Sequence, residues 1–259
     1  MRAPLSVTRL DVCTFVVDID GARAIFDPWL HDPARIWPWW TAHHRDAPVW
    51  TELPAVDLLL VSQRSDDHCD LRAIGGLTRA TPVVATASAA RRLRPLGFDV
   101  RAMAWGDRVE RGGFVITALP AGHAGVPDQN GYRLERSGRT VLFLADTARL
   151  PALVQALDAR RDVPDAVLVS ANGFRVLRRR INMNPEEAAE LVAHTRTPHV
   201  VPMRHLAREE ARGFVGRLLS DWITPEEAAT RFAAALQRAA APAAVHVLDR
   251  GQTWTATVG

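Results

Sequence analysis

The stretch VSQRSDDHCD at residues 61–70 decides how the rest of this sequence is interpreted. It follows the apolar run DLLLV at residues 57–61, which predicts a buried strand. It leads into LRAIGGL at residues 71–77, which predicts a short helix that ends at a glycine. An acid and an imidazole in a turn after a buried strand are typical of metal chemistry. Asp67 and His68 are therefore the first candidate ligands.

The composition is that of an ordinary globular protein. The chain has 259 residues, of which 47% are hydrophobic and 24% charged, and this length allows a sizeable core. No apolar run approaches the roughly 18 to 20 residues that would span a bilayer. The N-terminus lacks the apolar segment of a secretory signal, and Cys13 and Cys69 make no disulfide framework. We expect one cytoplasmic domain over residues 1–259, without a membrane span.

The positive charge does not predict a nucleic-acid partner. All 32 basic residues are arginine, and beside heavy alanine use this indicates a bias of genome composition. The arginines are spread along the chain, and the clusters at 91–92 and 178–180 are explained by solvated faces. We expect a small-molecule substrate and leave the oligomeric state open.

The pattern along the chain predicts a layered α/β arrangement. Residues 12–27 form a hairpin across Asp20-Gly21, and residues 28–54 form an irregular segment with five of the eight tryptophans. Further strands are expected at 82–86, 100–104, 114–119, 132–135, 140–144, 166–169, 199–203, 245–248 and 253–258, and helices at 89–96 after a Ser88 cap, 150–157, 184–195 and 224–238.

Histidines and an aspartate recur where predicted strands end: His68, His123, Asp146 and His205. Strand ends that face one edge of a sheet converge, so these residues can share one site.

Taken in order, these features resemble the metallo-β-lactamase fold superfamily, in particular its ascorbate-6-phosphate lactonase-like hydrolases. The residues that carry the resemblance are Asp67-His68, Gly122-His123, the hairpin from Asn130 to Asp146-Thr147, the helix from Asn184, and the segment from Pro202 to His205. The resemblance covers nearly the whole chain. It implies a four-layer αββα sandwich of two mixed β-sheets flanked by helices.

The resemblance also implies the ligands. The family's H-x-H-x-D-H loop falls on Gln63, Ser65, Asp67 and His68, so its two leading histidines are missing here. The site that would use them keeps His123 and a share of Asp146. The other site keeps Asp67, His68, Asp146 and His205.

Counting donors predicts one metal rather than two. Zn²⁺ takes about four ligands, and the first site has too few good ones. The second site has two imidazoles and two carboxylates, which suit Zn²⁺ first and also Mn²⁺ or Fe²⁺.

The same residues also have explanations that involve no metal. Asp66, Asp67 and Asp70 could satisfy helix amides, and His123 and His205 could be surface histidines. Arg64 and Arg204 could replace the metal's charge and leave a metal-free anion site. Cys69 fits a small buried hydrophobe better than a ligand or nucleophile. The tryptophans of 28–54 fit core or lid packing, and His31, His43 and His44 are remote candidates as extra ligands.

Three functions remain open. The first is a metal-dependent hydrolase of a small-molecule ester, lactone, amide or phosphoester, with one metal and with Asp67 or Asp146 as base. The second is an iron-dependent, non-hydrolytic redox enzyme on the same site. The third is a metal-free, non-catalytic member that binds a ligand through the tryptophan-rich segment.

Overall fold

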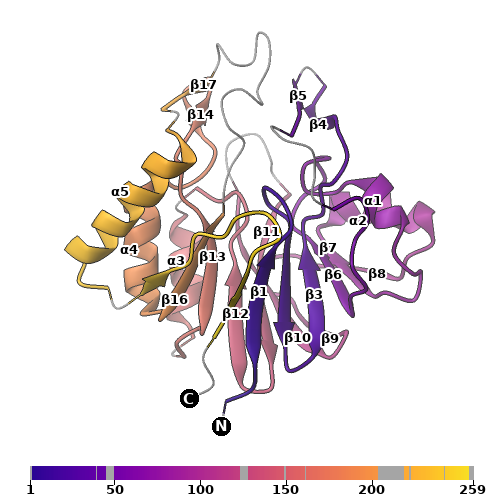
Figure 1. Ribbon diagram of the computed structural model, residues 1–259. Helices are drawn as coiled ribbons and strands as arrows, with labels where there is room; N and C mark the ends of the chain where they lie inside the picture. The colour runs from indigo at the N-terminus through magenta and orange to yellow at the C-terminus, as the bar shows by residue number, and fades with distance from the viewer. Residues whose placement is uncertain are drawn as a thin grey trace.

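The computed structural model is a sandwich of two large β-sheets with helices on both outer faces (Figure 1). It describes residues 2–38, 40–44, 50–122, 128–148, 150–160, 162–203, 219–221, 223–241 and 243–256. The order of layers is helix, sheet, sheet, helix. The four-layer α/β arrangement expected from the sequence is confirmed.

The first sheet is mixed, with the strand order β19-β1-β2-β3-β6-β7-β8. Strands β1 to β3 pair antiparallel, whereas β3, β6, β7 and β8 run parallel to one another. The hairpin expected at 12–27 is therefore confirmed as β2 and β3. The bounds are β1 Leu5–Arg9, β2 Phe15–Ile19, β3 Ala22–Phe26, β6 Leu58–Val61, β7 Val83–Ala85, β8 Val100–Ala102 and β19 Thr253–Thr255.

The second sheet mirrors the first, with the order β18-β16-β13-β12-β11-β10-β9. Strands β9 to β12 pair antiparallel, and β12, β13, β16 and β18 run parallel. The bounds are β9 Arg108–Arg111, β10 Phe114–Pro120, β11 Asn130–Arg136, β12 Arg139–Phe143, β13 Ala166–Ser170, β16 His199–Met203 and β18 Ala244–Val245.

The main core lies between the two sheets. Inward side chains of both sheets pack there, and Phe26 of β3 stacks on Phe143 of β12 with ring centroids 4.5 Å apart. The Tyr132 hydroxyl of β11 donates to the carbonyl of Val61 in β6 at 2.8 Å. These contacts fix the ends of the parallel strands of one sheet against those of the other.

Helices bury one face each on the outer sides of the sheets. The helices α1 Leu71–Gly75 and α2 Ala87–Leu93 cover the first sheet, and α4 Pro185–Thr195 and α5 Pro225–Arg238 cover the second together with α3 Pro151–Asp158. Asn184 begins α4 with a reciprocal capping box to Glu187, as the sequence predicts. The expected Ser88 cap is wrong: Thr86 caps α2, and Ser88 lies inside the helix.

The described part of the segment 28–54 contains regular structure that the sequence did not predict. It contains the hairpin β4 Ala34–Trp37 and β5 Trp40–Ala42, which packs against Phe174 and Ile181. The latter residues flank a small sheet of β14 Arg175–Val176, β15 Arg179–Arg180 and β17 Leu219–Ser220. Figure 1 shows both small sheets at the top of the sandwich, at the opposite end from the two termini.

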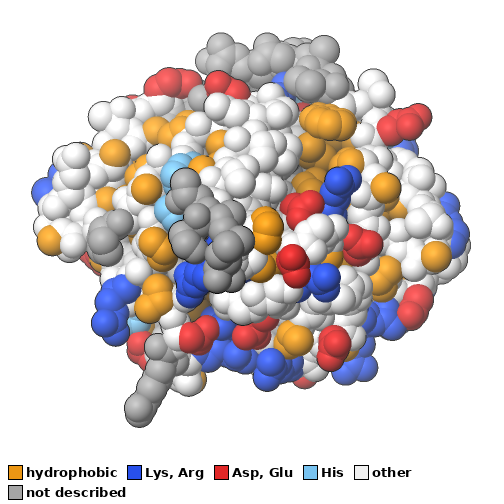
Figure 2. Space-filling view, turned by 60° about the horizontal axis from the view of Figure 1, so that its bottom comes forward, with side chains coloured by type: hydrophobic (Ala, Val, Ile, Leu, Met, Phe, Trp, Pro, Cys, Tyr) orange, Lys and Arg blue, Asp and Glu red, His pale blue; other side chains and the backbone are white. Residues whose placement is uncertain are grey.

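Basic and acidic side chains intermingle on the face in Figure 2, which brings the bottom of Figure 1 forward. Oppositely charged side chains also pair at the surface, as Arg111 does with Asp99 at 2.6 Å. Within the described ranges, no helix has the length and apolar character needed to cross a membrane.

Candidate metal centre

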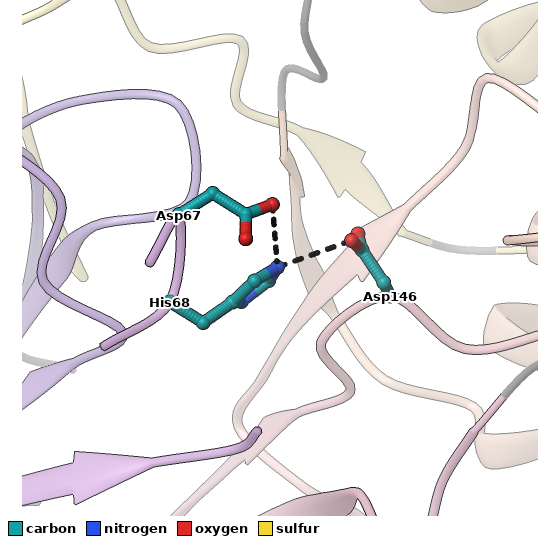
Figure 3. A group of neighbouring side chains, drawn as sticks. All are labelled: Asp67, His68 and Asp146. Carbon is teal, nitrogen blue, oxygen red and sulfur yellow. Dashed lines mark hydrogen bonds and ion pairs between the residues drawn. The ribbon is translucent and has the colours of Figure 1, made fainter. Parts of the chain in front are cut away.

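Three side chains converge where the two sheets meet at the top of the sandwich. One ligand atom from each of Asp67, His68 and Asp146 lies within 4.8 Å of the others. The His68 Nε2 atom is 3.2 Å from Oδ2 of Asp146 and 3.5 Å from Oδ2 of Asp67. Figure 3 shows the two residues of the first sheet pointing toward Asp146 of the second. The structure thus brings together three of the five residues expected at the site; His123 and His205 lie outside the described residues.

The turn that carries Asp67 and His68 is held at both ends. The amides of His68 and Cys69 donate to the Ser65 carbonyl, at 3.0 and 2.8 Å. Asp70 caps α1 by accepting from the amides of Arg72 and Ala73, and its other oxygen accepts from Leu30 and His31. The structural interpretation of Asp70 is therefore correct, and this cap fixes the end of the turn that carries Asp67 and His68.

Asp27 orients His68, and the sequence interpretation missed it. Its carboxylate is fully buried and lies 2.8 Å from Nδ1 of His68. It also accepts from the amide and hydroxyl of Ser62, at 2.7 and 2.5 Å. With Nδ1–H donated to Asp27, the Nε2 atom of His68 is directed at Asp67 and Asp146, which is the usual orientation of a ligand histidine. The available signal was an acid directly after the apolar strand 24–26.

Asp146 is positioned by the second sheet. The Ser170 hydroxyl, at the end of β13, lies 2.8 Å from the carbonyl of Ala145 and 3.3 Å from Oδ1 of Asp146. The Gln129 side chain donates to the Asp146 carbonyl at 2.9 Å. Asp27 and Ala145 both have positive φ, 45° and 49°, a conformation that non-glycine residues rarely adopt and that often occurs at functional sites.

The electrostatics of the cluster are those of crowded, buried carboxylates. Burial raises the pKa of Asp67, and the charge of Asp146 adds to this while His68 opposes it. Burial alone would lower the pKa of His68, but Asp67 and Asp27 outweigh it and raise the pKa well above its ordinary value. The site therefore favours a positive charge among its carboxylates.

The chemistry of the donor set fits a divalent cation. Oδ1 of Asp67 is buried without a hydrogen-bond partner among the described residues, which is costly unless a cation or water contacts it. Two carboxylates and one imidazole nitrogen suit Zn²⁺, Mn²⁺ or Fe²⁺. They make three of the about four ligands that Zn²⁺ takes.

Gln63 and Ser65, which stand where the resembling family has its two leading histidines, face the same cavity as the cluster. Gln63 and Ser65 are both buried and line this cavity. Cys69, by contrast, packs in the outer core, where burial raises the pKa of its thiol to about 12. Cys69 is therefore the buried hydrophobe that the sequence favoured.

Several other candidates have different roles. Asp66 accepts from the amide of Arg35 and pairs with Arg92. Of the histidines considered as extra ligands, His31 pairs with Asp70, and His44 is stacked on Trp29 with Asp32 at its Nδ1. Among the described residues, none of these belongs to the metal-like cluster. Arg64 is exposed, and Arg204 lies outside the described residues.

Solved structures with this fold include two hydrolases and a diiron hydroxylase. Igni18, a metallo hydrolase from the archaeon Ignicoccus hospitalis, is 20% identical with a TM-score of 0.69, covering 99% of this chain and 100% of that one. The isothiocyanate hydrolase from Delia radicum gut bacteria is 18% identical with a TM-score of 0.69, covering 96% and 98%. CmlA, a diiron β-hydroxylase from Streptomyces venezuelae, is 17% identical with a TM-score of 0.68; the match covers 99% of this chain but 54% of CmlA.

Among curated proteins, the sequence finds no match. Residues 22–205 match the family described as the beta-lactamase superfamily domain. This segment includes both halves of the sandwich core and all three residues of the cluster. The chain therefore belongs to the beta-lactamase superfamily, with the metallo-β-lactamase fold.

Proposed function

We propose that this protein is a metal-dependent hydrolase that acts on a small-molecule ester, lactone, amide or phosphoester through a single metal site. The observation that carries the proposal is the convergence of Asp67, His68 and Asp146 from two sheets, with donor atoms within 4.8 Å. His205 would complete the ligand set, with His123 nearby. Within the superfamily, the sequence features favour the ascorbate-6-phosphate lactonase-like branch.

The protein's own groups divide the work as follows. A bound divalent ion would supply Lewis acidity to the carbonyl or phosphoryl oxygen and to a water. Asp27 keeps the imidazole of His68 in one tautomer and orientation. Asp67 has a buried oxygen that no described residue contacts by a hydrogen bond, and this oxygen can accept a proton from the attacking water. Asp146 is the alternative base, and Ser170 orients its carboxylate.

An iron-dependent, non-hydrolytic enzyme is the second candidate. The observation that favours it is the donor set itself, because carboxylates with few imidazoles also suit Fe²⁺ and leave positions open for a co-substrate. Iron content with visible colour, and no ester hydrolysis, would select this candidate.

Metal analysis of the purified protein tests the proposal. We expect about one zinc or manganese per chain, and we expect Asp146→Ala and His205→Ala each to lower metal content strongly because each removes one of few ligands. Asp99→Ala, an exposed aspartate paired with Arg111, is the matched control and should keep the metal.

Two outcomes would overturn the proposal. If no divalent metal co-purifies or binds with at least micromolar affinity, both the hydrolase and the iron-enzyme proposals are wrong. If Asp146→Ala and His205→Ala both leave the metal content unchanged, the assigned ligands are wrong.

A further inference from the structure

The cavity in front of the cluster has an apolar wall. Four aromatic side chains, Trp29, Trp37, Trp40 and Phe174, line it together with Ile36 and Ile181. The tryptophans come from the segment after β3 and from the β4–β5 hairpin, and Phe174 and Ile181 come from the segment around β14 and β15. Two parts of the chain that are far apart in sequence thus build one apolar surface beside Asp67, His68 and Asp146.

Few of the described residues that line this cavity carry a charge. Its described lining contains no arginine, and its charged groups are those of the cluster. Proteins commonly hold phosphate groups with arginine or lysine side chains, or with helix N-termini. A phosphorylated substrate would therefore find no arginine along the described lining and would share the cavity with two carboxylates.

The wall has a buried part and an accessible part. Trp29 and Trp40 are buried, at 0% and 4% exposure, and serve the fold. Ile36 and Trp37 are half-buried, and the Trp37 ring lies 5.4 Å from that of Trp40. Covering these apolar atoms with a ligand would gain about 25 cal/mol for each Å² removed from water. Trp37 and Ile36 are thus the residues whose burial a substrate can complete.

Resting on the proposed hydrolase function, we propose that the substrate is a neutral carboxylic ester, amide or lactone with an aromatic or branched aliphatic group. This group packs on Trp37 and Ile36, and the acyl carbon faces Asp67, His68 and Asp146. In the reaction, the oxygen of water bonds to the acyl carbon and the bond to the alkoxy or amine group breaks. One proton of water passes to that leaving group.

Matched methyl esters test the proposal, because they share one leaving group. We expect kcat/KM to be at least ten-fold higher for methyl phenylacetate than for methyl acetate or for the anionic methyl phosphonoacetate, measured by pH-stat. Trp37→Ala should lower the value for methyl phenylacetate about ten-fold, mainly through KM, and so reduce its advantage over methyl acetate. Trp37→Phe should retain most of it. Trp254→Ala is the control, because Trp254 lies in β19 and stacks on His246, outside the described lining of the cavity.

A binding measurement separates this inference from the hydrolase proposal. Benzylacetone, a ketone that cannot be hydrolysed, should bind the intact protein by calorimetry more tightly than 2-butanone does, and Trp37→Ala should remove the difference. Ile36→Ala provides a second test of the same wall if Trp37→Ala unfolds. Benzylacetone binding without hydrolysis of any ester would support the pocket and contradict the hydrolase. Hydrolysis with no preference for the phenyl group, or a preference for methyl phosphonoacetate, would overturn the inference alone.

Discussion

Asp27 is the residue on which the geometry of the candidate metal centre most depends. Its carboxylate holds Nδ1 of His68 and two donors of Ser62, all within the buried interior. Asp27→Asn keeps the shape of the side chain but removes its charge and places an NH₂ group among donors. We expect Zn²⁺ affinity to fall about 10- to 100-fold, as for other residues that orient a ligand histidine.

Competition with a chromophoric chelator measures this loss. Asp99→Asn makes the same chemical change at an exposed position and should leave the affinity as in the wild type. Circular dichroism shows whether the variant is folded. A folded Asp27→Asn protein with unchanged affinity would show that His68 needs no orienting partner.

At the scale of single residues, acids and histidines at the ends of apolar strands led us to expect that Asp67, His68 and Asp146 share one site, and the structure brings these three side chains together. Asp27 carries the same signal after strand 24–26, but its value lies in a hydrogen bond to a residue 41 positions away. The apolar wall was out of reach for a similar reason. Trp37 and Phe174 meet only because two separate hairpins fold over the same edge.

One pair of histidines gives the β16–β18 contact a dependence on pH. Nδ1 of His199 lies 3.2 Å from Nε2 of His246, and both rings pack on Trp254. Burial lowers the pKa of both histidines. The charge of His199 lowers the pKa of His246 further. For His199, Asp165 opposes the decrease and Arg139 adds to it. The unfolded chain, with an imidazole pKa of about 6.5, therefore binds protons more readily than the folded one.

The free energy of unfolding should consequently rise with pH in this window and be lost as pH falls from about 7 toward the lowered folded pKa values. In urea titrations at pH 7.5 and 5.5, we expect His246→Gln to lose less stability on acidification than the wild type. His194→Gln, on the exposed face of α4, should show no such flattening. Equal acid sensitivity of His246→Gln and wild type would contradict this role of the pair.

At the scale of elements, local signals located most strands and helices and the cap of α4, but they missed the cap of α2 and the shortest strands. Thr86 rather than Ser88 caps α2 because Thr86 is the residue with extended backbone before the first turn. The hairpin at 34–42 was hidden by its proline and tryptophan content. Its two strands are three and four residues long and are stabilised by packing on Phe174 and Ile181, which no local pattern reports.

At the scale of the whole molecule, both sheets place their chemistry at the carboxyl ends of parallel strands. Strands β3 and β6 lead to Asp27 and to the turn with His68, and β12 and β13 lead to Asp146 and Ser170. Ligands bind at such ends in open α/β sheets as well. The site therefore exists only when the two halves pack together, which is a reason to propose that residues 1–259 form one cooperative domain.

The stacked pair of Phe26 and Phe143 tests that proposal, because each sheet contributes one fully buried ring. Phe143→Ala should lower the free energy of unfolding by about 3–5 kcal/mol, a large part of the 5–15 kcal/mol typical of a domain. Phe143→Leu, which leaves a smaller cavity, should cost less.

Hydrogen exchange followed by peptide mass spectrometry reports on β2–β3 and β11–β13 separately. In a cooperative domain, the slowest amides of both sheets lose the same protection free energy in Phe143→Ala. Loss confined to the second sheet would mean that the halves unfold independently, and the candidate metal ligands would then be held by two bodies rather than one.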